Sequence, residues 1–185
     1  AFEITTRKIH TFSNDECEFG YRDSIFKKKL KGKFIILSAC FSLQKFPHSI
    51  DISYGAINSQ LADKLATIQN IAEAVIAIRL SKLPNPKKIG NSGSFFKNPI
   101  ITLNDFKKLH KTFPKLPHYP SKEGFVKIPA GWIIESLGFK GIREGDAGVH
   151  EKQALVLVNY GTASGIQILG LAKQIQKAAL DKFGV

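Results

Sequence analysis

The sequence contains no methionine, only two cysteines and a single tryptophan. Cys17 and Cys40 have 22 residues between them, and no Cys-x-x-Cys or histidine spacing surrounds either one. A disulfide-stapled scaffold and a zinc site of ordinary ligand spacing are therefore excluded. One bridge between the two cysteines stays open, although isolated thiols are more often buried and inert. We expect a reducing, cytoplasmic compartment and no metal.

Long apolar runs are also absent. The longest, residues 34–37 and 154–158, are far too short to span a bilayer, and no signal-peptide pattern opens the chain. We therefore expect no membrane partner. The lack of methionine leads us to expect that Ala1 is not the natural start.

Acidic residues are scarce: 15 aspartates and glutamates face 27 lysines and arginines, which gives a net charge of +12. Such a surface concentrates anions, and nucleic acid, phosphorylated metabolites and acidic lipids all qualify. The rest of the composition, 43% hydrophobic and 23% charged, is that of a globular chain of 185 residues. As a soft prior, this length corresponds to one domain or somewhat more.

Hydrophobic periodicity predicts strands over residues 2–11 and 34–46, with a lysine-rich stretch at 26–33 between them. From Thr67, a good N-cap, the period becomes helical, and the helix should end at Leu83 because a proline follows. Its expected apolar face comprises Ile68, Ile71, Val75 and Ile78.

Residues 82–99 are rich in proline, glycine and asparagine, which predicts a long loop without regular structure. A short helix capped by Asn104, a loop at 117–122 and a short strand at 126–128 should follow.

The chain should then form a helix over 130–137, begun by a proline and ended by Gly138, and a buried strand over 154–159. Helices and strands without a βαβ rhythm indicate the α+β class. Thr162 or Ser164 should cap the last helix, whose expected apolar face is Ile168, Leu169, Ala172, Ile175, Ala179 and Phe183.

The 82–99 loop carries the most candidate chemistry. It presents Ser94 and Asn98 beside the cations Lys82 and Lys97, and its glycines let a ligand approach the backbone closely. The loop either offers these groups to an anionic ligand or is a surface loop whose two phenylalanines plug the core.

Three other features also have two interpretations. Arg22 offers a planar fork to a carboxylate or phosphate, or it pairs with a neighbouring acid on the surface. His150 is either a general base or a hydrogen-bonded structural residue. The lysines of 27–33 either contact a phosphodiester backbone or form a solvated face.

Five motifs follow one another along the chain: EFGYRDS (18–24), KLPNPK (82–87), GNSGSFFKNP (90–99), AGWIIESLGFKG (130–141) and GDAGVHEKQALVLVN (145–159). In order and spacing they resemble the UDP-N-acetylenolpyruvoylglucosamine reductases, flavoenzymes of early peptidoglycan synthesis. The resemblance covers nearly the whole chain.

The resemblance implies an enzyme that uses FAD and NADPH to reduce UDP-N-acetylglucosamine enolpyruvate to UDP-N-acetylmuramate. Hydride reaches the terminal carbon of the enol ether, and the enolate left beside the carboxylate must be stabilised and then protonated. By resemblance, Ser94 is the proton donor and Arg22 stabilises the enolate.

The same resemblance implies residues that hold the substrate, chiefly its diphosphate and uridine end. Tyr54 matches a tyrosine on a mobile loop that covers the substrate in one subclass of the family. The other matched positions are Tyr21, Lys82, Asn98, Tyr119 and Gln153.

Two parts of the family pattern are missing. Most FAD contacts should precede Ala1, so cofactor-binding residues stay unassigned, and a strand with a catalytic glutamate should follow Val185. Neither Glu135 nor Glu151 replaces that glutamate, because their neighbours differ. We therefore expect a fragment: residues 1–64 as the tail of the FAD-binding domain and 65–185 as the substrate-binding domain.

Such a fragment is expected to be a monomer that binds the UDP-sugar without reducing it, and to bind no nucleic acid. The alternative is a basic nucleic-acid-binding module built on the lysines of 27–33 and 87–88.

Overall fold

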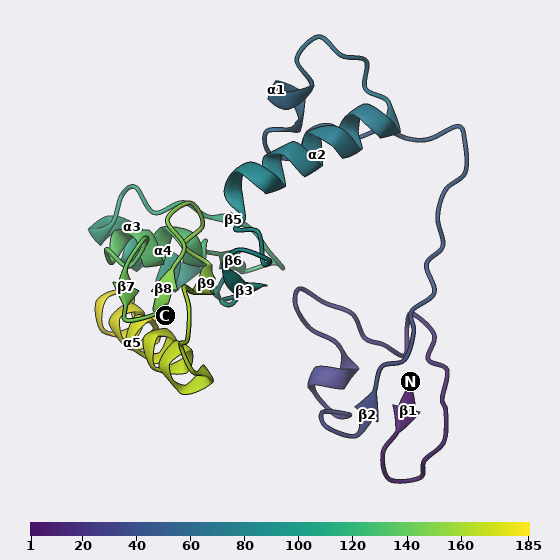
Figure 1. Ribbon diagram of the computed structural model, residues 1–185, viewed down its shortest axis with the longest axis horizontal. Coiled ribbons are helices and arrows are strands. Elements are labelled where there is room, and N and C mark those ends of the chain that lie inside the picture. Colours follow the sequence, from purple (N-terminus) through teal and green to yellow (C-terminus); the bar gives the residue numbers. More distant parts are fainter. The chain divides into compact units, whose positions relative to one another are not determined.

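The computed structural model describes residues 1–185, and its contacts divide the chain into two units, residues 1–49 and 50–185 (Figure 1). The boundary predicted after residue 64 concerns the domains of the family and stays a prediction. No helix combines the length and the apolar character that crossing a bilayer requires.

The 1–49 unit holds little regular structure. Strands β1 (Phe2–Glu3) and β2 (Phe34–Ile35) pair antiparallel, and a 3-10 helix, η1, spans Ile25–Lys27. The rings of Phe12, Phe26 and Phe34 form a small cluster with centroids 5.1 to 6.2 Å apart.

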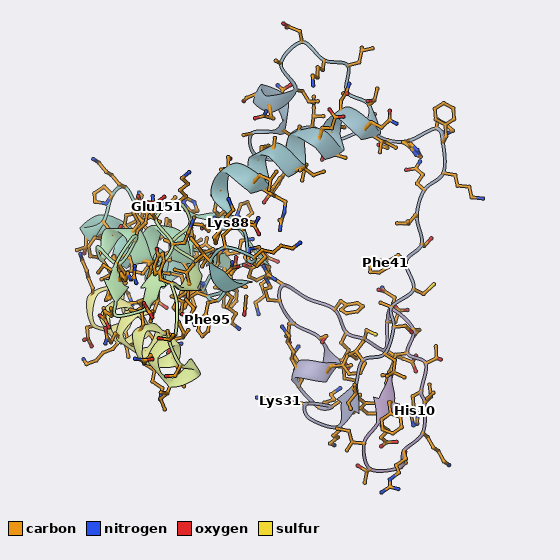
Figure 2. All side chains as sticks on the ribbon, viewed as in Figure 1. His10, Lys31, Phe41, Lys88, Phe95 and Glu151 are labelled. Carbon is orange, nitrogen blue, oxygen red and sulfur yellow. The ribbon has the colours of Figure 1, made fainter.

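The strands predicted over 2–11 and 34–46 are therefore wrong beyond their first two residues. The physical reason is that a two-stranded ribbon needs a third strand or a packed face to persist. Among residues 1–49 only Cys17 and Ser24 are buried, whereas Phe41 is 77% exposed (Figure 2). Both cysteines are free, and Cys40 is exposed, contrary to the expectation of two buried thiols.

Helices α1 (Ile57–Leu61) and α2 (Ile68–Lys82) pack together around Ala74. The predicted cap is confirmed: the Thr67 hydroxyl accepts the N–H of Asn70 at 3.2 Å. The predicted end is confirmed as well, because Leu83 is the C-cap. On the predicted apolar face, Ile68 is an exception and is 50% exposed.

An antiparallel four-stranded sheet follows, in the order β3 (Gly90–Ser94), β9 (Val156–Asn159), β8 (Ala147–Val149) and β7 (Arg143–Glu144). Helix α5 (Gly165–Phe183) packs against β8 and β9 (Figure 1). Their shared core includes Val149, Leu157, Leu171, Ala172 and Ile175. The expected α5 face is thus corrected at one position: Leu171 is buried and Leu169 is exposed.

The prediction that 82–99 has no regular structure is wrong for β3. A Gly-Asn-Ser-Gly-Ser segment has little intrinsic preference for a strand. It becomes one because the buried strand β9 lies beside it and supplies backbone partners.

A second antiparallel sheet has the order β4 (Ile100–Thr102), β6 (Phe125–Lys127) and β5 (Tyr119–Pro120), so the predicted 117–122 loop contains an edge strand. Helices α3 (Leu103–Thr112) and α4 (Ala130–Ser136) contribute to its core.

The cap predicted at Asn104 is wrong: the Thr102 hydroxyl accepts the N–H of Asp105 at 3.1 Å. The expected limits of α4 are confirmed, with Pro129 as N-cap and Gly138 in the left-handed region at φ 80°. Mixed helices and antiparallel sheets make this an α+β fold, as predicted.

We expect Ser164→Ala to lower the free energy of unfolding by about 1 kcal/mol. Ser164 caps α5: its side chain accepts the N–H of Gln167, whose side chain accepts the N–H of Ser164 in return. Urea denaturation followed by the fluorescence of Trp132, whose ring lies 5.8 Å from Phe183 of α5, measures the loss. Ser121→Ala, in an exposed loop, is the control, and an equal loss there would contradict the prediction.

Candidate functional site

Ser94 stands exposed at the end of β3, beside Val156 of β9. The register shifts between Asn91 and Ser94, and the Asn91 Oδ1 accepts the N–H of Gly93 at 3.1 Å within this shift. Gly93 has φ 74°, a conformation that side chains other than glycine rarely adopt. The Asn-Ser-Gly sequence thus forms the local kink that presents Ser94.

The residues after Ser94 are held both by the four-stranded sheet and by the start of helix α4. Phe95 donates its N–H to the carbonyl of Leu155 at 2.8 Å, and Phe96 packs against the core of the four-stranded sheet. The Asn98 Oδ1 then accepts the N–H of Ala130 at 2.9 Å, at the start of α4. Only Phe96 plugs the core, because Phe95 is half exposed (Figure 2).

Gln153 reaches the same end of the sheet from the turn before β9. The N–H of Val156 donates to the Gln153 carbonyl at 3.0 Å, and Val156 is the register partner of Ser94. Three residues predicted by resemblance, Ser94, Asn98 and Gln153, therefore come from segments that adjoin one another.

Tyr119 lies on the second sheet, next to a cation that the sequence analysis missed. In register, Lys127 of β6 lies between Tyr119 of β5 and Ile100 of β4. The Lys127 Nζ is 5.9 Å from the centroid of the Tyr119 ring. The available signal was the alternation around Lys127, whose neighbours Val126 and Ile128 are buried.

Lys82 is exposed at the last residue of α2, where the segment leading to β3 begins. The Asn91 side chain ties that segment to β3 by donating to the Pro84 carbonyl at 3.4 Å. Tyr54 is 83% exposed before α1.

Tyr21 and Arg22 belong to the 1–49 unit. They lie in a tight turn closed by reciprocal backbone hydrogen bonds between Gly20 and Asp23, at 3.0 and 3.2 Å. Arg22 has φ 55°, and its carbonyl accepts from the Lys27 Nζ at 3.0 Å.

No hydrogen bond or ion pair joins a carboxylate to Ser94, Asn98 or Gln153. Glu135 forms an ion pair with Lys140 at 2.8 Å, and Glu151 is exposed (Figure 2). The structure has no group of three or more histidine, cysteine or acidic side chains that could hold a metal ion.

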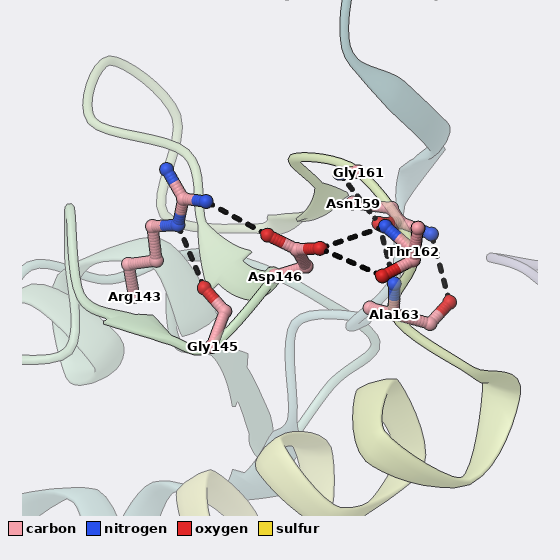
Figure 3. Close-up of polar contacts among 7 residues, drawn as sticks. All are labelled: Arg143, Gly145, Asp146, Asn159, Gly161, Thr162 and Ala163. Carbon is pink, nitrogen blue, oxygen red and sulfur yellow. Dashed lines mark hydrogen bonds and ion pairs between the residues drawn. The ribbon is translucent and has the colours of Figure 1, made fainter.

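The opposite end of the four-stranded sheet is fixed by Asp146 (Figure 3). Its carboxylate accepts the N–H and the hydroxyl of Thr162, at 2.8 and 3.0 Å, and pairs with Arg143 at 2.8 Å. The backbone hydrogen bond from Thr162 is the main reason that the pKa of Asp146 is lowered. A Cβ on Gly161 would lie 2.7 Å from this carboxylate, so a larger residue there would push the Asp146 side chain out of its present position.

Comparison with known proteins identifies the family of the chain. Residues 85–185 match the profile of the UDP-N-acetylenolpyruvoylglucosamine reductase C-terminal domain. The chain therefore belongs to the UDP-N-acetylenolpyruvoylglucosamine reductase family, and the resemblance seen in the motifs is confirmed.

Two curated relatives bear that reductase name. The protein of Flavobacterium johnsoniae is 53% identical over all of this chain and 56% of its own length, and that of Pseudomonas putida is 45% identical over all of this chain and 55% of its own length. The chain thus spans a little over half the length of these relatives. The crystal structure of the Thermus caldophilus reductase gives a TM-score of 0.37 at 26% identity, over 60% of this chain and 30% of that one.

We expect Asp146→Asn to destabilise the protein at neutral pH, because an amide cannot keep both the Thr162 and the Arg143 contacts. A lowered carboxyl pKa stabilises the fold above the ordinary pKa, and this contribution is lost as the pH falls through the lowered value. The difference in unfolding midpoint between wild type and variant should therefore shrink below about pH 4.

Asp181→Asn is the matched control, since Asp181 pairs only with exposed Lys177, at 2.6 Å on α5. Thermal unfolding across the pH range measures both variants. A wild-type advantage over Asp146→Asn that is constant with pH would contradict the assigned contacts.

Proposed function

We propose that the intact protein containing this chain reduces UDP-N-acetylenolpyruvoylglucosamine to UDP-N-acetylmuramate in peptidoglycan precursor synthesis, as an NADPH- and FAD-dependent monomer in the cytoplasm. The observation that carries the proposal is that the segments holding Ser94, Asn98 and Gln153 adjoin one another at one end of β3, in a chain of this family. The two curated relatives, which align with the whole of this chain, are both named UDP-N-acetylenolpyruvoylglucosamine reductase.

FAD, when bound, would supply hydride taken from NADPH. The groove beside β3, lined by Gly90, Phe95 and Ile168 among others, has a volume of about 300 Å³. This is the lower limit for a small-molecule site, about 300 Å³. This groove is too small to hold a flavin dinucleotide, so no residue of the chain is assigned to FAD binding.

The protein's own residues then have two tasks. One is to protonate the carbon next to the substrate carboxylate once hydride has reached the terminal carbon. Ser94 is the hydroxyl presented at the site, and a hydroxyl is weakly acidic, so it needs nearby positive charge to donate its proton. We propose that Arg22 supplies this charge and stabilises the enolate.

The other task is to hold the UDP-sugar, which carries a diphosphate and a carboxylate. Lys82 and Lys127 offer ammonium groups, Tyr119 an aromatic ring, and Asn98 and Gln153 amide groups. Tyr21 and the exposed Tyr54 complete the proposed set. The net charge of +12 favours such an anionic ligand.

Ser94→Ala should lower kcat about 1,000-fold, the scale of a lost general acid. It should leave the Kd for UDP-N-acetylenolpyruvoylglucosamine nearly unchanged, because the proton is needed only after binding. NADPH oxidation by the intact protein measures kcat, and titration calorimetry measures Kd. Ser92→Ala, two residues earlier on the same strand, is the control. A kcat unaffected by Ser94→Ala would remove Ser94 from the acid role.

Lys82→Ala should raise the Kd for UDP-N-acetylglucosamine about tenfold, or roughly 1.4 kcal/mol for one charge-assisted contact. The effect should weaken as salt rises, since screening reduces the attraction. Titration calorimetry at two salt concentrations measures it. Lys173→Ala, on α5, removes the same charge elsewhere. Equal effects of the two variants would place the diphosphate away from Lys82.

A further inference from the structure

His150 is a buried histidine that the proposed chemistry does not use. It follows β8 directly, and its side chain is among the few buried polar ones, with the residue 7% exposed. Its N–H donates to the Val156 carbonyl at 2.9 Å, which continues the pairing of Val149 with Leu157. His150 thus keeps the antiparallel register of β8 and β9.

This register places Ser94, Val156 and His150 side by side across three chain segments. Residues directly opposite one another in antiparallel strands project from the same face. That face is the one opposite α5, because Val149 and Leu157, the neighbouring pair, belong to the α5 core. His150 and Ser94 are therefore separated by two strand spacings, about 10 Å, on one face of the sheet.

His150 also organises the turn that carries Gln153. Its Nδ1 accepts the backbone N–H of Lys152 at 3.3 Å, and its carbonyl accepts the N–H of Gln153 at 3.3 Å. A neutral imidazole can accept at Nδ1, whereas a protonated one carries hydrogen on both nitrogens and cannot. Protonation of His150 therefore breaks the hydrogen bond from the Lys152 N–H and replaces it with repulsion between that N–H and the Nδ1–H of the ring.

We infer that His150 is a positioning residue for the proposed sugar-nucleotide site: its neutral Nδ1 holds the turn of residues 150–153 so that Gln153 can bind the substrate, and protonation releases that turn. The inference rests on the proposed function, because it assigns Gln153 a ligand. It makes substrate affinity, rather than the chemical step, the quantity that His150 controls.

The charges around the ring favour the neutral form. Burial is the main cause of a lowered His150 pKa, and Lys152 lowers it further, whereas Glu151 acts in the opposite direction. The strands on the Ser94 side of β8 add no charge, since residues 154–158 and 90–94 hold no ionisable side chain. On the other side, β7 carries Glu144 and Arg143, and Arg143 is paired with Asp146. The neutral, turn-holding form thus prevails at neutral pH, and release occurs on the acid side of the ordinary histidine range.

Two substitutions distinguish the effect of the hydrogen-bond acceptor at Nδ1 from the effect of the aromatic ring. His150→Phe keeps a planar ring without an acceptor, and His150→Asn places an amide oxygen near the position of Nδ1 without a titratable group. We expect His150→Phe to raise KM about tenfold with little change in kcat, the effect of one lost binding contact. His150→Asn should restore most of the affinity and abolish the rise in wild-type KM at acid pH.

The experiment is steady-state kinetics of the intact protein with UDP-N-acetylenolpyruvoylglucosamine between pH 5 and 8, a range that brackets the ordinary histidine pKa of about 6.5. Trp132 fluorescence checks that each variant is folded. Lys152→Ala is the matched control, because it removes the charge and keeps the backbone N–H that His150 accepts.

The amide exchange of Lys152 gives a readout independent of turnover: its protection should fall in acid in the wild type and stay constant in His150→Asn. An active wild type with unchanged KM in His150→Phe, or equal acid sensitivity in His150→Asn, would overturn this inference alone. A wild type without reductase activity would overturn the proposed function and this inference together, even where Lys152 protection depends on pH.

Discussion

The pairing of β3 with β9 is the interaction on which the candidate site depends. The side chains of Gly90–Ser94 have almost nothing to bury, so β3 exists only because β9 offers it a backbone edge. Strand β9 is held in turn by apolar burial beneath α5, where Leu157 meets Leu171 and Ile175. The burial of β9 therefore positions Ser94 indirectly: the hydrophobic effect fixes the buried strand β9, and the pairing of β3 with β9 fixes the exposed Ser94.

Helices α4 and α5 connect the two sheets of the 50–185 unit. On α4, the adjacent residues Ile133 and Ile134 belong to different cores, and on α5 Ile175 and Phe183 do the same. Close packing on both sides leaves little freedom between the sheets. This packing bears on the proposal, because Ser94 stands on one sheet while Tyr119 and Lys127 stand on the other.

Local signals predicted two helix limits correctly, whereas helix α1 was not predicted and the cap assigned to Asn104 was wrong. Thr67 and Gly138 mark helix limits through contacts within a few residues, and these limits are correct. Strand β3 escaped prediction because its partner β9 lies more than 60 residues away in sequence, and β5 because a two-residue Tyr-Pro strand has no alternating pattern of its own. The composition of the 82–99 loop made Ser94 a candidate, and only the motif resemblance gave it the role of proton donor. Lys127 was missed because its relation to Tyr119 exists only after β5 pairs with β6.

Asn98 combines a structural and a proposed ligand role in one short side chain. Its Oδ1 is committed to the first N–H of α4, while its Nδ2 makes no hydrogen bond within the protein. Aspartate would keep the acceptor but set a negative charge before an anionic substrate, and alanine would lose both groups. Natural variation at this position should therefore be narrow, since under the proposed role a change in substrate affinity here would also alter how helix α4 begins.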